Sequence, residues 1–87
     1  MTSRPVTIAN PLGLHARAAA RFVQVASTCV SHVRVTRGPR VVDGKSIMGL
    51  LLLAAARGSD IVISAEGPDE IETVERLCRL VERGFDS

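Results

Sequence analysis

His15 and Arg17 stand where a loop containing proline and glycine, residues 10–14, meets a segment with helical periodicity. The first turn of a helix leaves backbone N–H groups without partners and carries about half a positive charge, so it can hold an anion. The same positive end favours a neutral, nucleophilic imidazole. Attack of that imidazole on phosphorus would form a phosphohistidine. The N–H groups of Ala16 and Arg17 and the Arg17 guanidinium would stabilise its charge.

A histidine at a helix start can equally be no more than a poor N-cap, because imidazole is not favoured at that position. Three neighbouring features favour a reactive histidine over a poor N-cap. They are the turn at Gly13, the arginine at position 17, and the small residues around 16–20 that leave room for a docking partner. We therefore predict that His15 is the reactive residue.

Two other motifs do not indicate a functional site. Gly44-Lys45-Ser46 resembles the end of a phosphate-binding loop, but the glycine that this loop requires five residues earlier is Pro39. His32 opens a predicted strand without ligand-like neighbours in sequence, so we expect it at the surface.

The elements that must position His15 follow from the spacing of apolar residues. Alternation predicts strands at 6–8, 32–36, 40–42 and 60–65, with a hairpin turn at Gly38-Pro39. Spacing of three and four predicts a helix at 16–26, with Arg17, Arg21 and Gln24 on its wet side. The inward side of that helix is predicted to consist of Ala19, Phe22, Val23 and Ala26.

Two further helices are predicted. Ser46 would cap a short helix running to about Leu53, with Gly58 past its end. Pro68 would occupy the first position of a last helix, which Gly84 would end. Two pairs spaced four apart, Glu72–Arg76 and Glu75–Arg79, would support it by a few tenths of a kcal/mol each. Its buried stripe is predicted to consist of Ile71, Val74, Leu77, Cys78 and Val81.

The predicted order is βαββαβα, and the strands are apolar on one face only. Such strands favour an antiparallel sheet covered by helices on a single side. We expect an α+β open-faced sandwich, with a four-stranded antiparallel sheet and three helices on one face. The 87 residues suffice for one domain, spanning 1–87.

The charge and the aromatic content argue against nucleic acid as a partner. The net charge is only +2, but residues 1–59 hold eight basic side chains and one acid, whereas residues 60–87 hold three basic and eight acidic ones. This asymmetry would steer acidic partners. Phe22 and Phe85 are the only aromatic residues, too few for base stacking. A small basic nucleic-acid binder is therefore disfavoured.

The remaining features predict a cytoplasmic protein without membrane insertion. The apolar run 47–56 is too short to cross a bilayer, and the N-terminus lacks a signal-peptide pattern. Cys29 and Cys78 have no metal-ligand spacing, so we expect neither a metal nor a cofactor. Cys78 lies in an apolar helical stripe and is predicted to be a buried, reduced thiol.

Three segments in register resemble the histidine-containing phosphocarrier (HPr) family of the bacterial phosphotransferase system. The segments are Gly13-Leu14-His15-Ala16-Arg17, Lys45-Ser46-Ile47-Met48-Gly49-Leu50 and Ile63-Ser64-Ala65-Glu66-Gly67. The resemblance runs from about Val6 to Val81. One departure is Ala18, where many members have proline; alanine adds an N–H donor to the first turn.

The resemblance implies a cycle in which Enzyme I, charged by phosphoenolpyruvate, phosphorylates His15 on Nδ1. A IIA-type domain then receives the group, for sugar uptake or for a regulatory branch. Arg17 would compensate the phosphate charge. Both partners would share an apolar docking patch, and its expected members are Ala20, Ile47, Met48 and Leu51. For Leu50 and Leu53 we expect ordinary core positions, and for the whole protein a monomer that acts as a carrier and not as an enzyme.

Ser46 has two interpretations. It is a good N-cap, whose loss to alanine would cost about 1 kcal/mol. In many family members the matching serine is phosphorylated by a dedicated kinase, so HPr kinase/phosphorylase is a further implied partner. The rival to the carrier is a regulatory binding module that is switched at Ser46 and relays no phosphate. The presence of both His15 and Arg17 favours the carrier.

Overall fold

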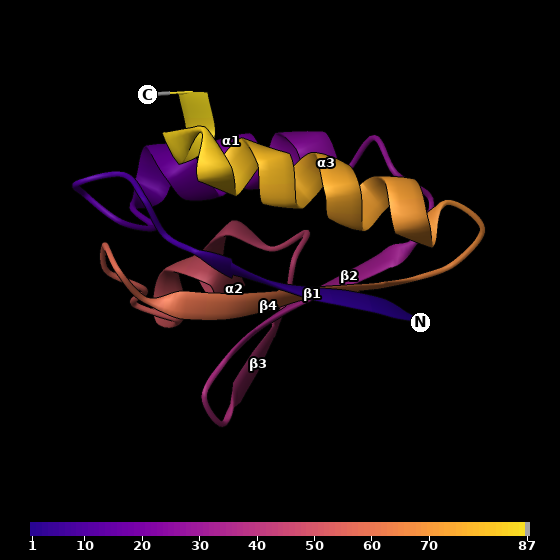
Figure 1. The fold of residues 1–87 in the computed structure, drawn as a ribbon, viewed down its shortest axis with the longest axis horizontal. Helices are drawn as coiled ribbons and strands as arrows, with labels where there is room; N and C mark the ends of the chain where they lie inside the picture. The colour runs from indigo at the N-terminus through magenta and orange to yellow at the C-terminus, as the bar shows by residue number, and fades with distance from the viewer. Residues whose placement is uncertain (87) are drawn as a thin grey trace.

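Alternation of side chains builds a sheet that is apolar on one face. In the computed structural model, which describes residues 1–86, the four strands pair antiparallel throughout in the order β1-β4-β2-β3 (Figure 1). Val33, Ile61 and Ile63 point to the core, whereas Arg34 and Ser64 alternate with them on the other face. The strands are β1 (Thr2–Thr7), β2 (His32–Arg37), β3 (Arg40–Asp43) and β4 (Asp60–Glu66).

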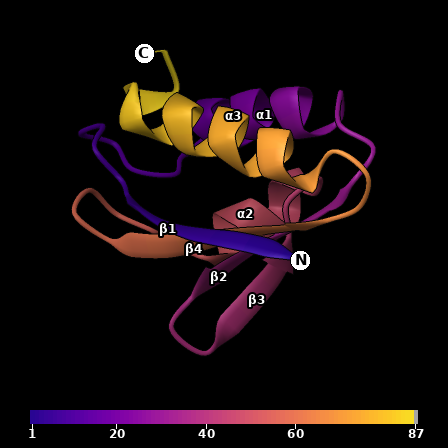
Figure 2. The ribbon, with the colours of Figure 1, turned by 45° about the vertical axis from the view of Figure 1, so that its right-hand side comes forward.

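The helices close the apolar face of the sheet. They are α1 (Ala16–Ala26), α2 (Ile47–Leu52) and α3 (Glu70–Glu82), followed by a 3-10 turn, η1 (Gly84–Asp86). α1 and α3 lie side by side over the sheet (Figures 1 and 2), and α2 packs against α1 and β3. Phe22, Leu50 and Leu77, one from each helix, share a single core with the strands. The predicted α+β sandwich and its element order are confirmed.

The first strand is longer than predicted. It spans Thr2–Thr7 in place of 6–8, and Ile8 is buried just past its end, where its N–H donates to the Ser59 carbonyl at 2.9 Å. Pro5 interrupts the pattern that is typical of a strand, so the sequence does not predict the first part of β1. A proline is tolerated there because β1 is an edge strand and pairs only with β4.

Two predictions for the last helix are wrong. The helix begins at Glu70 with Asp69 as N-cap, so Pro68 precedes it. Ile71 is 71% exposed and does not belong to the buried stripe. The buried stripe of the helix lies at 73–74, 77–78 and 80–81, so burial begins after the first turn, in which Ile71 lies. The other stripe positions, including Cys78, are buried as predicted.

Only one of the two predicted i,i+4 pairs forms. Arg79 Nη2 lies 2.5 Å from Glu75 Oε1, whereas no ion pair joins Glu72 to Arg76 within residues 1–86. Arg76 instead donates to the Cys29 sulfur at 3.6 Å. Both cysteines are buried and free, and burial raises the pKa of the Cys78 thiol.

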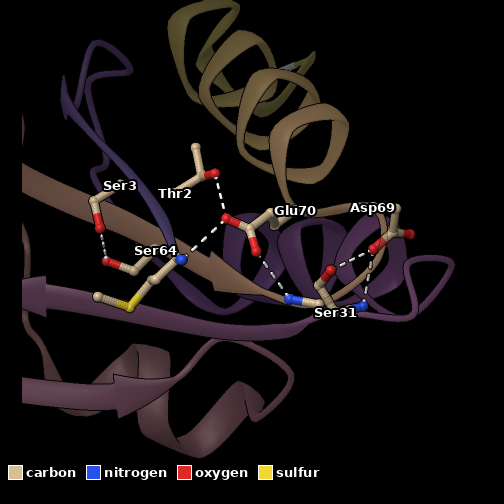
Figure 3. Close-up of polar contacts among 8 residues, drawn as sticks. Thr2, Ser3, Ser31, Ser64, Asp69 and Glu70 are labelled. Carbon is tan, nitrogen blue, oxygen red and sulfur yellow. Dashed lines mark hydrogen bonds and ion pairs between the residues drawn. The ribbon is translucent and has the colours of Figure 1, made fainter.

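A carboxylate pair ties the start of α3 to distant segments (Figure 3). Asp69 accepts hydrogen bonds from the N–H groups of Val30 and Ser31, both at 3.0 Å, and from the Ser31 hydroxyl. Glu70 accepts one from the Thr2 hydroxyl at 2.6 Å. These bonds fasten the loop after α1 and the strand β1 to one helix end.

This arrangement makes the fold acid-sensitive. The Ser31 hydroxyl is the main cause of a lowered pKa at Asp69, and the Thr2 hydroxyl is the main cause at Glu70. A lowered pKa means that the stabilisation is complete above the unfolded carboxyl value of about 4 and is lost as the pH falls below it. We expect the melting temperature to fall below about pH 4 and Asp69→Asn to flatten that fall. An equally steep fall in Asp69→Asn would contradict this, and Glu66→Gln at an exposed site is the control.

The end of α2 lies close to the predicted Leu53, but alanine and not glycine adopts the left-handed conformation there. The helix ends at Leu52, and the residue after its C-cap, Ala54, adopts a φ of 51°. Gly58 lies farther along the chain. Arg37 and Arg40 satisfy the last carbonyls of the segment by donating to Leu53 and Leu52 at 3.1 and 2.7 Å.

Ala54→Gly is expected to stabilise the protein by about 0.5–1 kcal/mol, because glycine adopts a left-handed conformation without the Cβ penalty. Urea unfolding measures the change. Ala20→Gly, at an exposed position inside α1, is the matched control and should destabilise by about 1 kcal/mol. Loss of stability in Ala54→Gly would show that the left-handed residue is not strained.

Candidate functional site

The loop before α1 is fixed by a glycine that no other residue can replace without strain. Gly13 has a φ of 67°, its N–H donates to the Asn10 carbonyl at 3.1 Å, and a Cβ added to it would lie 2.5 Å from the Ala55 carbonyl oxygen. The next residue, Leu14, donates its N–H to that same oxygen at 2.9 Å. The loop therefore runs tightly against the segment after α2 before the chain enters α1.

His15 is the N-cap of α1, as predicted. Its backbone is extended, with a φ of −84° and a ψ of 179°, and its imidazole makes no capping hydrogen bond. The first bond of the helix runs from the Ala19 N–H to the His15 carbonyl at 2.8 Å. The N–H groups of residues 16–18 therefore precede the first intrahelical bond and are available at the positive helix end.

His15 and Arg17 line one surface cavity of about 370 Å³, together with Asn10, Pro11 and Leu12. His15 is half-buried and Arg17 is exposed. None of the ion pairs formed within residues 1–86 uses Arg17. The cavity thus lies at the first turn of a helix, between an imidazole that makes no capping hydrogen bond and a guanidinium that forms none of these ion pairs. Such an arrangement can bind an anion.

The expected docking residues are not all equally exposed. Ala20 and Ile47 are exposed and Met48 is 67% exposed, whereas Leu51 is half-buried and packs against the core. Leu50 and Leu53 are buried core residues, as predicted.

Sequence reasoning missed two exposed leucines, Leu12 at 77% and Leu52 at 65%. Leu12 lines the cavity beside His15, and Leu52 follows the exposed start of α2. A signal for Leu52 was present: once Leu50 and Leu53 are assigned to the core, the helical period turns Leu52 outward. We use the term apolar patch for the exposed apolar residues Leu12, Ala20, Ile47, Met48 and Leu52 of the loop before α1, of α1 and of α2. The half-buried Leu51 stays a predicted docking residue.

Ser46 caps α2. Its backbone is extended, and its hydroxyl oxygen accepts the Gly49 N–H at 3.0 Å. Ala18, the departure from the family pattern, is buried in the core beneath the first turn of α1. His32 is exposed, as predicted.

Residues 1–86 contain no group of three or more His, Cys, Asp or Glu side chains that could hold a metal ion. No helix among them combines the length and the apolar character needed to cross a membrane.

Comparison with known proteins shows the family to which this chain belongs. The family model "PTS HPr component phosphorylation site" matches residues 2–83. The phosphocarrier protein HPr of Cupriavidus necator is 47% identical over 85 residues, covering 98% of this chain and 96% of the relative. That of Pseudomonas aeruginosa is 47% identical over 87 residues, covering 99% and 97%.

The same relationship holds among solved structures. A crystal structure of HPr from Thermoanaerobacter tengcongensis superposes with a TM-score of 0.95 at 41% identity, covering 100% of this chain and 98% of that chain. HPr from Bacillus anthracis gives a TM-score of 0.89 at 38% identity, covering 92% and 95%. The family model and the relatives span nearly the whole chain, so this protein belongs to the HPr phosphocarrier family of the phosphotransferase system.

Proposed function

We propose that this protein accepts a phosphoryl group from Enzyme I on His15 and passes it to a IIA-type domain. The observation that carries the proposal is the cavity that His15 and Arg17 share at the first turn of α1. An imidazole that caps nothing is free to act as a nucleophile, and the Arg17 guanidinium can pair with phosphate oxygens in bidentate fashion.

The transfer forms one bond and breaks another. The lone pair of imidazole Nδ1, the atom that the family resemblance implies, forms an N–P bond as the bond from phosphorus to the donor breaks. The N–H groups of Ala16 and Arg17 stabilise the phosphoryl oxygens, and the reverse exchange delivers the group to the acceptor. The protein is thus a stoichiometric carrier with a covalent intermediate and no turnover of its own.

The surface suits acidic partners. Residues 1–59 hold eight basic side chains and one acid, and they contain both the cavity and the apolar patch. Electrostatic attraction between residues 1–59 and an acidic partner accelerates their encounter, while exposed Met48 and Leu52 offer apolar contact area.

Incubation with phosphoenolpyruvate and active Enzyme I tests the proposal. We expect a mass gain of one phosphate that is lost in acid. Enzyme I activity is verified on a second HPr in parallel, so an unmodified wild-type chain would contradict the carrier function.

We further propose that Ser46 is a regulatory phosphorylation site for HPr kinase/phosphorylase. A phosphate at the N-terminus of α2 is favourable to the helix dipole, so it requires no unfolding. Its negative charge would lie beside Ile47 and Met48, in the patch that is offered to acidic partners. Phosphorylation would therefore weaken docking and leave the fold intact.

Ser46→Asp is expected to bind Enzyme I several-fold more weakly, measured by calorimetry at low ionic strength. Ser46→Ala separates charge from capping: it should lose about 1 kcal/mol of stability with the Gly49 hydrogen bond, yet bind like the wild type. Equal affinity of Ser46→Asp and Ser46→Ala would contradict the regulatory role.

A further inference from the structure

Asn10 is a buried polar residue in the loop before His15, and the proposed phosphoryl transfer does not use its side chain directly. The residue is 5% exposed, and its Nδ2 donates to the Gly13 carbonyl at 2.8 Å. Its Oδ1 has no hydrogen-bond partner, and it is the one such buried side-chain atom among residues 1–86. An unsatisfied buried acceptor costs free energy. An apolar residue of similar size would avoid that cost, so the amide needs another explanation.

The hydrogen bonds of Asn10 lead to His15 in two steps. The Asn10 carbonyl accepts the Gly13 N–H at 3.1 Å, and its side chain donates to the Gly13 carbonyl, so both sides of Asn10 hold Gly13. The Gly13 carbonyl also accepts the His15 N–H at 3.0 Å. Asn10 therefore fixes the peptide group that sets the entry of His15 into α1, and it lines the same cavity.

We propose that Asn10 is a positioning residue for phosphoryl transfer: its side-chain amide clamps Gly13 and thereby holds the N-cap geometry of His15. The proposal rests on the proposed carrier function of His15. An amide suits this place for two reasons. It supplies the donor that the Gly13 carbonyl needs, and it brings no negative charge into a cavity that must admit a phosphoryl group. An ionised carboxylate would fail on both counts.

The clamp has a readout that is independent of phosphorylation. In Asn10→Ala, backbone hydrogen exchange at Gly13 and His15 should become at least about tenfold faster than in the wild type. Thr73→Val is the matched control, because it removes a different buried bond, from the Thr73 hydroxyl to the Asp69 carbonyl at 2.8 Å, away from this loop. It should leave exchange at Gly13 and His15 unchanged. Unchanged exchange in Asn10→Ala would overturn the clamp.

The effect on transfer is read from the rate of phosphorylation by Enzyme I. At about pH 7.5, Asn10→Ala and Asn10→Asp should both be slowed at least about tenfold, and Thr73→Val should not. Position 10 is only 5% exposed, and burial disfavours the ionised form of the carboxyl in Asn10→Asp. As the pH falls to about 5, a growing fraction of this carboxyl is protonated and can donate to the Gly13 carbonyl, so the rate of Asn10→Asp should rise relative to that of the wild type. Arg17 and His15 line the same cavity as Asn10, so each rate is divided by the wild-type rate at the same pH.

The outcomes separate the two proposals. A phosphorylated wild type with variants of equal rate would overturn the positioning role. A wild type that Enzyme I does not phosphorylate would contradict the carrier function, and hydrogen exchange would then decide the clamp by itself.

Discussion

Replacing His15 by alanine should leave a folded chain that takes no phosphoryl group from Enzyme I. The imidazole is half-buried and makes no capping hydrogen bond, so its removal should change the free energy of unfolding by no more than about 1 kcal/mol. Its loss removes the only nucleophile that the cavity offers, because Arg17, Asn10 and the two apolar lining residues cannot form a phosphoryl intermediate. Mass spectrometry after incubation with phosphoenolpyruvate and Enzyme I measures the loss of phosphorylation, and thermal unfolding measures the change in stability.

His32 supplies the matched control for this substitution. It is the other histidine of the chain and is exposed on β2, outside the cavity. His32→Ala should accept phosphate like the wild type. Arg17→Ala should keep the nucleophile but lose a charged partner of the phosphate, which slows transfer by about 10²-fold without abolishing it. An acid-labile phosphate on His15→Ala would move the acceptor to another residue.

The site was predictable where it depends on local sequence. Gly13 before His15, followed by apolar residues at helical spacing, indicates a loop that enters a helix, and the structure places His15 at the N-cap. Ser46 before the second helical segment was equally clear, because a hydroxyl at an N-cap needs only a backbone N–H three residues along. Such features involve partners within one turn, so sequence alone determines them.

The missed features involve partners far apart in the chain. Asp69 looked like part of a helix start, but its carboxylate holds Val30 and Ser31, which lie 39 and 38 residues earlier. Arg76 was expected to pair with Glu72, yet the fold brings it to Cys29. Local spacing can show that such side chains are polar and exposed on a helix, but the packing of α1 against α3 decides what they contact.

Asn10 combines both situations. Asparagine in a loop with proline and glycine indicates a turn, and its contact with Gly13, three residues on, is local. Its burial is not local, because it depends on how closely the loop approaches Ala55 beyond α2. The sequence therefore predicts a loop at this place, but it does not show that a buried hydrogen bond from the Asn10 side chain holds the loop.

Gly13→Ala should test that close approach with the largest expected loss of stability, about 2–4 kcal/mol. A φ of 67° is costly for alanine, and the new Cβ would lie 2.5 Å from the Ala55 carbonyl oxygen, a backbone atom that cannot rotate away. The loop must then move, which breaks the Leu14–Ala55 bond and shifts His15 from its place at the helix start. We therefore expect a lower midpoint in urea and slower phosphorylation by Enzyme I.

Gly38→Ala separates the two causes, since Gly38 also has a positive φ, 57°, but a Cβ there would meet nothing within 4 Å. It should lose only the conformational term, about 0.5–1 kcal/mol as for Ala54, and keep the wild-type rate of phosphorylation. Equal losses of stability in the two variants would mean that the contact with Ala55 does not constrain the loop. A destabilised Gly13→Ala that is still phosphorylated at the wild-type rate would mean that the loop adds stability without setting the position of His15.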